Sequence, residues 1–442
     1  MDLFDLGCYF SHHVPFKARS LPLLKYAACA YAAKQLFRAK GKKAVYGGVA
    51  GVSAHMESFD DQAVDWEWEG ALYYDRSIGL LKEEIQDQNA IRSDEVVAAS
   101  AILSVYEFIS DNGSAWSRHL NGTKSLLDIV EDSMMPIEVP GSYYPAVSPR
   151  RQPSTARRAT FWNFARQDYI AAFINDSHTR LDTEDLQMWR DAGLQLTEQG
   201  DVVPSDRSRQ SLFEGETMGE DMFSNALVWV SSRICNYLAS GEVFEPTPAG
   251  DKTEVPRMEV GLVGESQVSL LQRWGALETA LEIWHDGLPA TFQPSARIKT
   301  AGRDLGCRHD ASLRFEEIWY VMPMCAATMQ HYHMARILLL INKPHETTAG
   351  RSTIGDRIGS YRAIDREATR HCYEICGIAL ARPPASVRVH STQPLFVAGQ
   401  YFEQTNERQV VLDLLRSIKD DLGWSTEDRI QQLLKQWGWD DG

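Results

Sequence analysis

The sequence predicts an all-α fold, a large multi-helix domain in which helix pairs pack round one central buried helix. Hydrophobic stretches with helical period follow one another along the chain, separated by short polar or proline-rich joints. We find no run of alternating apolar and polar residues convincing enough to form a strand ladder, and no internal repeat. Residues 319–344 are apolar most of the way round a helix, which is typical of a helix buried on most of its circumference.

Size and charge place the chain among ordinary globular proteins. Its 442 residues are 44% hydrophobic and 24% charged, and we expect one domain that spans residues 1–442. The formal net charge of −15 argues against tight binding to nucleic-acid phosphates, which requires a basic surface. The first residues lack the basic and apolar segments of a signal peptide, and no window is long and apolar enough to cross a membrane. We therefore expect a cytoplasmic protein.

The seven cysteines are scattered and include no CxxC motif, which suits free thiols in a reducing compartment. Cys372, Cys376 and the neighbouring His371 lie about one helical turn apart and would make half of a metal site. Buried thiols are the commoner explanation of such a pair. We predict neither a metal nor a cofactor.

The N-terminal part is predicted to be a succession of helices. Residues 21–40 are rich in alanine and other good helix formers, and their basic C-terminal end suits the helix dipole. Ser93, followed by two acidic residues, has the features of an N-terminal cap. The helices expected in this part span residues 21–40, 66–85, 93–110 and 116–131.

The remaining helices are separated by two proline-rich segments. Residues 133–153 are predicted to be a loop or linker, and residues 241–264 a second loop. Pro323 is expected to bend or restart the central helix, because proline lacks a backbone donor and clashes with the preceding turn. Residues 393–399 are predicted to be a buried connection. The helices expected here span residues 155–175, 221–239, 267–284, 319–344, 355–381, 407–422 and 426–437.

Common catalytic fingerprints are missing from the sequence, but three helices carry polar groups on aromatic stripes. On the helix at 221–239, Trp229, Arg233 and Asn236 share a face that is interpreted as a plain polar surface. On the helix at 155–175, Trp162, Arg166, Tyr169 and Phe173 fall within about 60° of one another. An arginine among aromatics is either a buried ion-pair and cation–π anchor or a ligand clamp. Both interpretations stay open.

The central helix carries the third stripe. His331 shares it with Tyr320 and Met324, and it is either a ligand-binding group or a core histidine satisfied by a partner. Arg336 points elsewhere and is interpreted as a scaffold ion pair. Trp284, near the end of its helix, is a candidate for a pocket rim.

Four motifs in order resemble the fungal-specific transcription factor domain. They are WSRHLNG (Trp116 to Gly122), FWNFARQDYIAAF, HYHMARILLLINKP, and QPLFVAGQYF followed by ERQVVLDLLRSIKDDLGWSTEDRIQQLLKQW. The resemblance covers about residues 10–440. It implies a large all-α regulatory region of the kind usually found behind a zinc binuclear-cluster DNA-binding domain. The six cysteines of that cluster are not in this sequence, so we expect no DNA-binding domain.

Because the chain resembles this family but lacks its DNA-binding domain, we favour an enzyme. Hetero-Diels–Alder cyclases of fungal tropolone-sesquiterpenoid biosynthesis are similar to this domain without its zinc cluster. The similarity implies a cofactor-independent pericyclase of secondary (meroterpenoid) metabolism, which joins a tropolone quinone methide to a humulene-type sesquiterpene. Such a reaction needs a dry aromatic cavity and a few polar groups that orient the partners.

In this hypothesis Arg166, Tyr169 and His331 are catalytic, and the substrate-binding residues are Trp162, Phe173, Trp284, Tyr320 and Met324. The expected partners are the two small-molecule substrates, with no nucleic acid and no membrane, and a homodimer is an open alternative to a monomer. The alternative function is a non-DNA-binding transcriptional regulator or effector-binding domain of the zinc-cluster family, which would place the protein in the nucleus.

Overall fold

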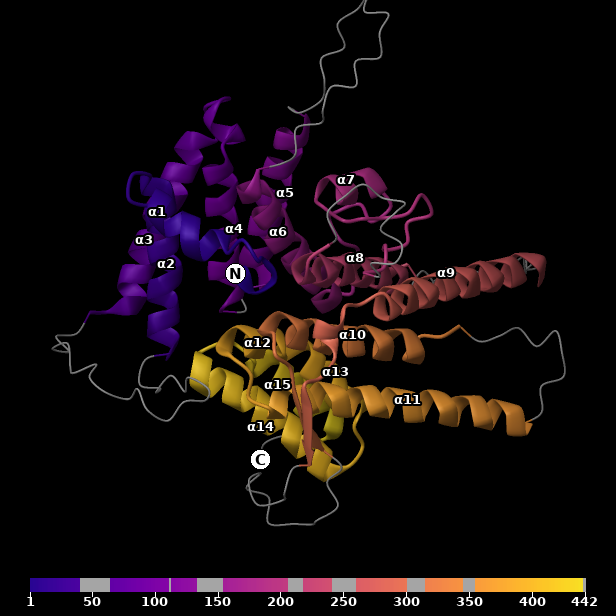
Figure 1. Cartoon of the computed structure of the whole chain (residues 1–442). Helices are drawn as coiled ribbons and strands as arrows, with labels where there is room; N and C mark the ends of the chain where they lie inside the picture. The colour runs from indigo at the N-terminus through magenta and orange to yellow at the C-terminus, as the bar shows by residue number, and fades with distance from the viewer. Residues whose placement is uncertain are drawn as a thin grey trace, which may run out of the picture. The chain divides into compact units, whose positions relative to one another are not determined.

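The computed structural model describes residues 1–39, 64–110, 113–132, 154–205, 218–240, 260–299, 315–344 and 354–439. Within these residues the chain forms fifteen α-helices and two short strands (Figure 1), which confirms the all-α prediction. The predicted loop at 133–153 lies outside the described residues. The chain divides into two compact units by its internal contacts, and each is described by itself. The expectation of a single domain over residues 1–442 stays a prediction.

The first unit comprises residues 1–168, 180–194 and 417–425. Its helices are α1 (Val14–Lys17), α2 (Pro22–Ala39), α3 (Trp66–Glu84), α4 (Asp94–Phe108), α5 (Gly113–Asp132), the greater part of α6 (Thr155–Ile174), and α7 (Leu186–Asp191). Helices α2, α3 and α5 all contact α4.

Helix α4 forms the centre of the first unit. The Ser93 side chain accepts a hydrogen bond from the Val96 backbone N–H at 3.3 Å, which confirms the predicted N-terminal cap. Nearly every α4 side chain from Val96 to Val105 is buried. The Ser100 and Thr123 hydroxyls satisfy each other at 2.7 Å in the interface between α4 and α5. An apolar helix with its few hydroxyls paired is what a core position requires.

The second unit comprises residues 169–179, 195–416 and 426–442. Its elements are α8 (Glu220–Ala239), α9 (Val260–Asp286), β1 (Ala296–Lys299), β2 (Glu316–Trp319), α10 (Pro323–Ile341), α11 (Ile354–Leu380), α12 (Ala385–His390), α13 (Thr392–Tyr401), most of α14 (Thr405–Leu422), and α15 (Glu427–Trp437). Helix α10 contacts α8, α11, α12 and α13, and its side chains from Met324 to Ile337 are buried. The predicted central buried helix is therefore present in this unit.

Three boundaries differ from the sequence-based expectation. Helix α10 begins at Pro323 rather than at residue 319, because proline fits the first helical turn, where its missing N–H is not needed. Residues 393–399 form most of the helix α13 instead of a connection. Helix α9 begins at Val260, inside the segment predicted to be a loop.

The strand pair β1–β2 is absent from the sequence-based prediction. The two strands are antiparallel, with Ala296 opposite Trp319 and Lys299 opposite Glu316. Strands of four residues are too short to show a reliable alternation, and their pairing partner lies far along the chain.

Gly377 fixes strand β2 against helix α11. A Cβ atom at this position would come within 2.5 Å of the Glu316 carbonyl oxygen and within 2.9 Å of the Ile318 side chain. Only glycine allows backbone and helix to approach so closely. The strand pair is thereby held along one side of α11, where it borders the groove described below.

Candidate functional site

The histidine of the central helix is buried against a tyrosine of α6. The Tyr169 hydroxyl and the His331 Nδ1 are hydrogen-bonded, and the ring centroids lie 5.7 Å apart. Burial lowers the pKa of His331 to about 4, although a hydrogen bond to the backbone of His390 acts in the opposite direction. Burial raises the pKa of the Tyr169 phenol well above its usual value. At neutral pH a neutral imidazole therefore faces a protonated phenol, which is how a satisfied core histidine is built.

The two predicted site residues in the first unit have partners there. The Trp162 indole N–H donates to the Ala192 carbonyl oxygen at 2.9 Å, and its ring lies 5.7 Å from the ring of Trp189. The Arg166 guanidinium lies 4.9 Å from the centre of the Phe4 ring, and the residue is 8% exposed. This geometry matches the cation–π anchor among the two interpretations of Arg166.

The other predicted residues belong to the second unit. The Trp284 indole is fully buried and donates to the Phe223 carbonyl oxygen at 2.9 Å. Met324 is buried near the start of α10. Tyr320 is half-buried in the link between β2 and α10, so it does not share the helical stripe of His331. Phe173 is half-buried near the end of α6. Of the predicted site residues, Tyr169 and His331 are the pair brought into direct contact.

The thiols of the suggested metal half-site are buried in α11. Burial raises the pKa values of Cys372 and Cys376, which keeps both as thiols. The described residues contain no cluster of three or more potential metal-ligating side chains. His371, the third member of the suggested set, contacts a histidine of α10 instead.

A buried histidine pair between α10 and α11 was missed by sequence reasoning. The Nδ1 atoms of His333 and His371 lie 2.7 Å apart, so one must donate and the other accept. Burial lowers the pKa of His371 to about 3 and lowers that of His333 well below its usual value. A carboxylate flanks each ring at 3.8 Å, Glu374 beside His333 and Glu367 beside His371. The pair is neutral at physiological pH.

The buried arginine of α10 is an ion-pair centre, as the sequence predicts. Arg336 Nη2 lies 2.6 Å from Glu367 Oε1, and its Nη1 lies 3.8 Å from Glu278 and 3.7 Å from Glu282. The three carboxylates come from α9 and α11, so one guanidinium links three helices of the second unit. The signal for such a role is an arginine in an otherwise apolar helix.

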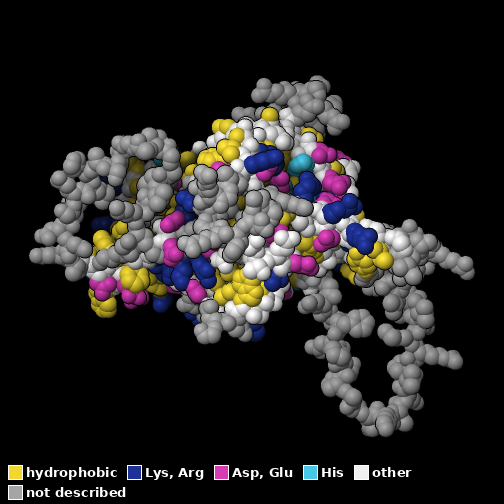
Figure 2. All heavy atoms as spheres, turned by 90° about the horizontal axis from the view of Figure 1, so that it is seen from below, with side chains coloured by type: hydrophobic (Ala, Val, Ile, Leu, Met, Phe, Trp, Pro, Cys, Tyr) yellow, Lys and Arg dark blue, Asp and Glu magenta, His cyan; other side chains and the backbone are white. Residues whose placement is uncertain are grey.

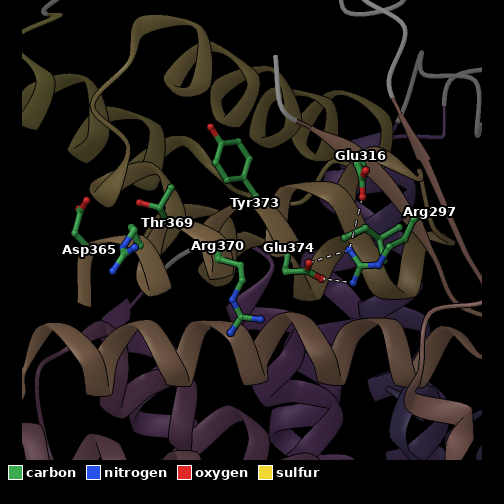
Figure 3. A pocket seen from close by; sticks show the side chains of 9 residues that line it. Arg297, Glu316, Asp365, Thr369, Arg370, Tyr373 and Glu374 are labelled. Carbon is green, nitrogen blue, oxygen red and sulfur yellow. Dashed lines mark hydrogen bonds and ion pairs between the residues drawn. The ribbon is translucent and has the colours of Figure 1, made fainter. Parts of the chain in front are cut away.

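An open groove of about 440 Å³ runs along α11 beside the strand pair (Figure 3). We call it the α11 groove. The side chains that line it are Arg297, Glu316, Ile318, Asp365, Arg366, Thr369, Arg370, Tyr373 and Glu374. Its members come from three segments far apart in the sequence, which is why no local motif points to it.

The acidic side chains of the groove all have partners. Arg297 forms a bidentate pair with Glu374, with both N–O distances at 2.9 Å, and lies 4.0 Å from Glu316. Asp365 accepts a hydrogen bond from the Tyr401 hydroxyl at 2.8 Å. Figure 3 shows the Arg297–Glu374–Glu316 cluster at one end of the groove and Asp365 at the other.

Two arginines of the groove, Arg366 and Arg370, differ from Arg297 in their partners. Arg366 Nε donates to the backbone oxygen of Arg362 at 3.2 Å, and Arg370 lies 3.5 Å from the His371 ring nitrogen. Within the described part of the chain, neither Arg366 nor Arg370 forms an ion pair with a carboxylate. Both side chains are exposed. The groove therefore offers two guanidinium groups one helical turn apart to an outside anion.

Charge is mixed on the molecular face drawn in Figure 2, where basic and acidic side chains of the described residues lie interspersed among apolar ones. The net charge of −15 is thus a whole-chain average that describes no single local surface. None of the described helices combines the length and apolar character needed to span a bilayer.

Comparison with known proteins identifies the family. The model of the fungal specific transcription factor domain matches residues 7–441. In an alignment 482 positions long, the chain is 38% identical to the transcription activator AMTR1 of Alternaria alternata. That alignment includes 99% of this chain and 61% of the relative, so the chain spans about three fifths of the relative's length. No solved structure matches the chain.

These matches overturn the prediction of a Diels–Alder cyclase. The family and the relative are transcription factors, so the assignments as an enzyme, a pericyclase and a biosynthetic protein are wrong. The expectation of tropolone and sesquiterpene substrates with no nucleic-acid partner is wrong for the same reason. Physically, aromatic stripes with embedded polar groups are shared by catalytic cavities and by satisfied cores, and the average charge of a chain does not exclude DNA or protein partners.

In the described geometry, the polar groups His331 and Arg336 of the central helix are paired with partners inside the second unit. The motifs quoted from the sequence lie within the matched range. The chain belongs to the family of the fungal specific transcription factor domain.

Proposed function

We propose that this chain is the regulatory region of a transcription factor, and that it changes the output of the genes to which the factor is directed. The family match over residues 7–441 carries this proposal. The similarity to a transcription activator, which extends over 99% of this chain, supports activation as the direction of this change. The cytoplasmic expectation gives way to the nuclear one under this proposal.

The arrangement of the second unit supports a regulatory role. Its central helix is buried and held by the Arg336 ion pairs and the His333–His371 pair, which give a stable scaffold. The α11 groove lies on the same helix that contributes Glu367 and His371 to this scaffold. A ligand or partner in the groove would therefore act on a helix that packs directly on the core of the unit.

A tethering experiment tests the proposal. The chain is fused to a heterologous DNA-binding domain, once alone and once with a strong activation segment, upstream of a reporter gene in yeast. We expect the chain to raise reporter output several-fold over the DNA-binding domain alone, or to change the output of the activation segment. Equal output with and without the chain in both fusions, at equal protein level, would contradict a regulatory role.

Nuclear location is tested separately. A fluorescent fusion of the chain in a fungal cell is expected to accumulate in the nucleus, or to do so when a DNA-binding partner is coexpressed. Uniform cytoplasmic fluorescence in both conditions would argue for a role outside transcription.

A further inference from the structure

We propose that the α11 groove binds a small organic anion, a carboxylate or phosphate ester on an apolar body, through Arg366 and Arg370. The inference deepens the proposed function by naming the chemical class of an effector. Binding itself does not depend on that function, because it is measured without transcription.

Two of the three arginines in the groove, Arg366 and Arg370, form no ion pair with a carboxylate among the described residues, in a lining that has three basic and three acidic side chains. The carboxylates of Glu374, Glu316 and Asp365 already have partners, as described above. Arg366 and Arg370 lie four residues apart on α11, a spacing at which like charges repel. Arginine stays charged at physiological pH and presents paired donors that match the two oxygens of a carboxylate or phosphate. An anion bound at Arg366 and Arg370 would relieve this repulsion and use guanidinium N–H groups that do not pair with a carboxylate.

The walls of the groove determine the size and polarity of the part of the ligand beyond its anionic group. The Tyr373 hydroxyl donates to Glu407, and its ring packs 5.0 Å from that of Phe315, so the aromatic wall is held in place. Ile318 of β2 adds an apolar surface, and Thr369 a hydroxyl beside the arginines. A volume of about 440 Å³ is within the range of small-molecule sites, roughly 300–1,000 Å³, and is too small for a folded partner. The groove therefore fits a compact molecule with one anionic end and one apolar end.

Position also connects the groove to the core. Arg370, which lines the groove, lies 3.5 Å from the ring nitrogen of the buried His371, and Glu374, also in the lining, is the carboxylate 3.8 Å from His333. An anion on Arg370 thus sits next to the polar network between α10 and α11. Binding of a ligand in the groove would in this way affect the packing between α10 and α11 inside the second unit.

The probes are benzoate, phenyl phosphate and neutral benzamide, which share one phenyl body. Each is titrated into the full chain and followed by ligand-observed NMR. We expect saturable binding of benzoate or phenyl phosphate with a Kd of about a millimolar or tighter, and none by benzamide. Preference between the two anions tells whether the site takes a carboxylate or a phosphate.

Matched variants locate the site. The double variant Arg366→Gln with Arg370→Gln should weaken binding by roughly tenfold or more. Arg362→Gln, on the same exposed helix but outside the groove, should change it by less than about twofold. A second double variant, Arg366→Lys with Arg370→Lys, keeps the charge, and its affinity should lie between those of the wild type and the glutamine variant. If circular dichroism shows that the glutamine variant does not fold, the lysine variant takes its place in the test.

The result that overturns the proposal is equally specific. No saturable binding of either anion, or binding that is unchanged in the double variants, removes the site. If a hexaglutamate peptide displaces the probe and binds more tightly than either anion, the groove is a peptide-binding surface and the small-molecule proposal is wrong.

Discussion

At the scale of single residues, the polar groups of the central helix are explained by their partners. Helical periodicity places His331 on a buried stripe, and burial confirms that placement. Its partner Tyr169 lies 162 residues away, and periodicity carries no information on such pairings. The same holds for His333 and Arg336, whose partners come from α9 and α11. Sequence reasoning can therefore find buried polar residues but cannot tell a catalytic from a structural environment.

Buried neutral histidines make stability depend on pH. His331 takes up a proton only near pH 4 in the folded protein, but near 6.5 when unfolded. Between these values unfolding takes up a proton, so stability is full above about pH 6.5 and is lost as the pH falls. From pH 7.5 to 5, His331 alone should lower the free energy of unfolding by about 2 kcal/mol.

Urea unfolding of the wild type and of His331→Phe at pH 7.5 and 5 measures this effect. The variant leaves the Tyr169 hydroxyl without its acceptor and starts less stable, so the quantity compared is the pH-dependent loss. That loss should be about 2 kcal/mol smaller in the variant. His12→Gln, at an exposed histidine, is the control. An unchanged loss in His331→Phe would mean that the imidazole is not neutral and buried.

Arg336 provides a second test at this scale. Arg336→Met removes the guanidinium that pairs with Glu367, Glu278 and Glu282. Because these carboxylates are 30–58% exposed, water screens part of their repulsion, and we expect a loss of about 2 kcal/mol in denaturant unfolding. Arg362→Gln, exposed on α11, should change stability little. Unchanged or raised stability in Arg336→Met would show that an apolar side chain serves this position as well.

At the scale of elements, long helices are predictable and short strands are not. Helices such as α2 and α3 have a composition and period that local sequence specifies, and their predicted limits hold within a residue or two. Strands β1 and β2 are four residues each, and every residue of one pairs with a residue of the other some twenty positions away in the sequence. Their pairing depends on Gly377 of α11, which no local pattern connects with residues 316–319.

Gly377 tests whether β2 must touch α11. Gly377→Ala would force a methyl group onto the Glu316 carbonyl, and we expect a loss of about 1–3 kcal/mol in the free energy of unfolding. Gly359→Ala is the matched control on the same helix, where an added Cβ meets nothing within 4 Å. That change should leave stability equal or raise it by up to about 1 kcal/mol through helix propensity. Equal effects of the two substitutions would contradict the close approach of β2.

At the scale of the whole molecule, the sequence supports the fold class and the family but not the site. The four motifs quoted from Trp116 to Trp437 lie in the matched range and resemble the family correctly. The step from that family to a cyclase rested on a missing zinc cluster and on aromatic stripes, and the family match contradicts it. The α11 groove was not predicted, because its lining joins residue 297, residues 316–318 and residues 365–374 in space.

The most direct measurement of the central claim is reporter output from the chain tethered to DNA. The wild type and Gly359→Ala should both change output several-fold relative to the DNA-binding domain alone, whereas Gly377→Ala should lose part of the effect with its fold. Output that is the same with and without the wild-type chain, both for the DNA-binding domain alone and for the DNA-binding domain carrying an activation segment, at equal levels of folded protein, would contradict a regulatory function.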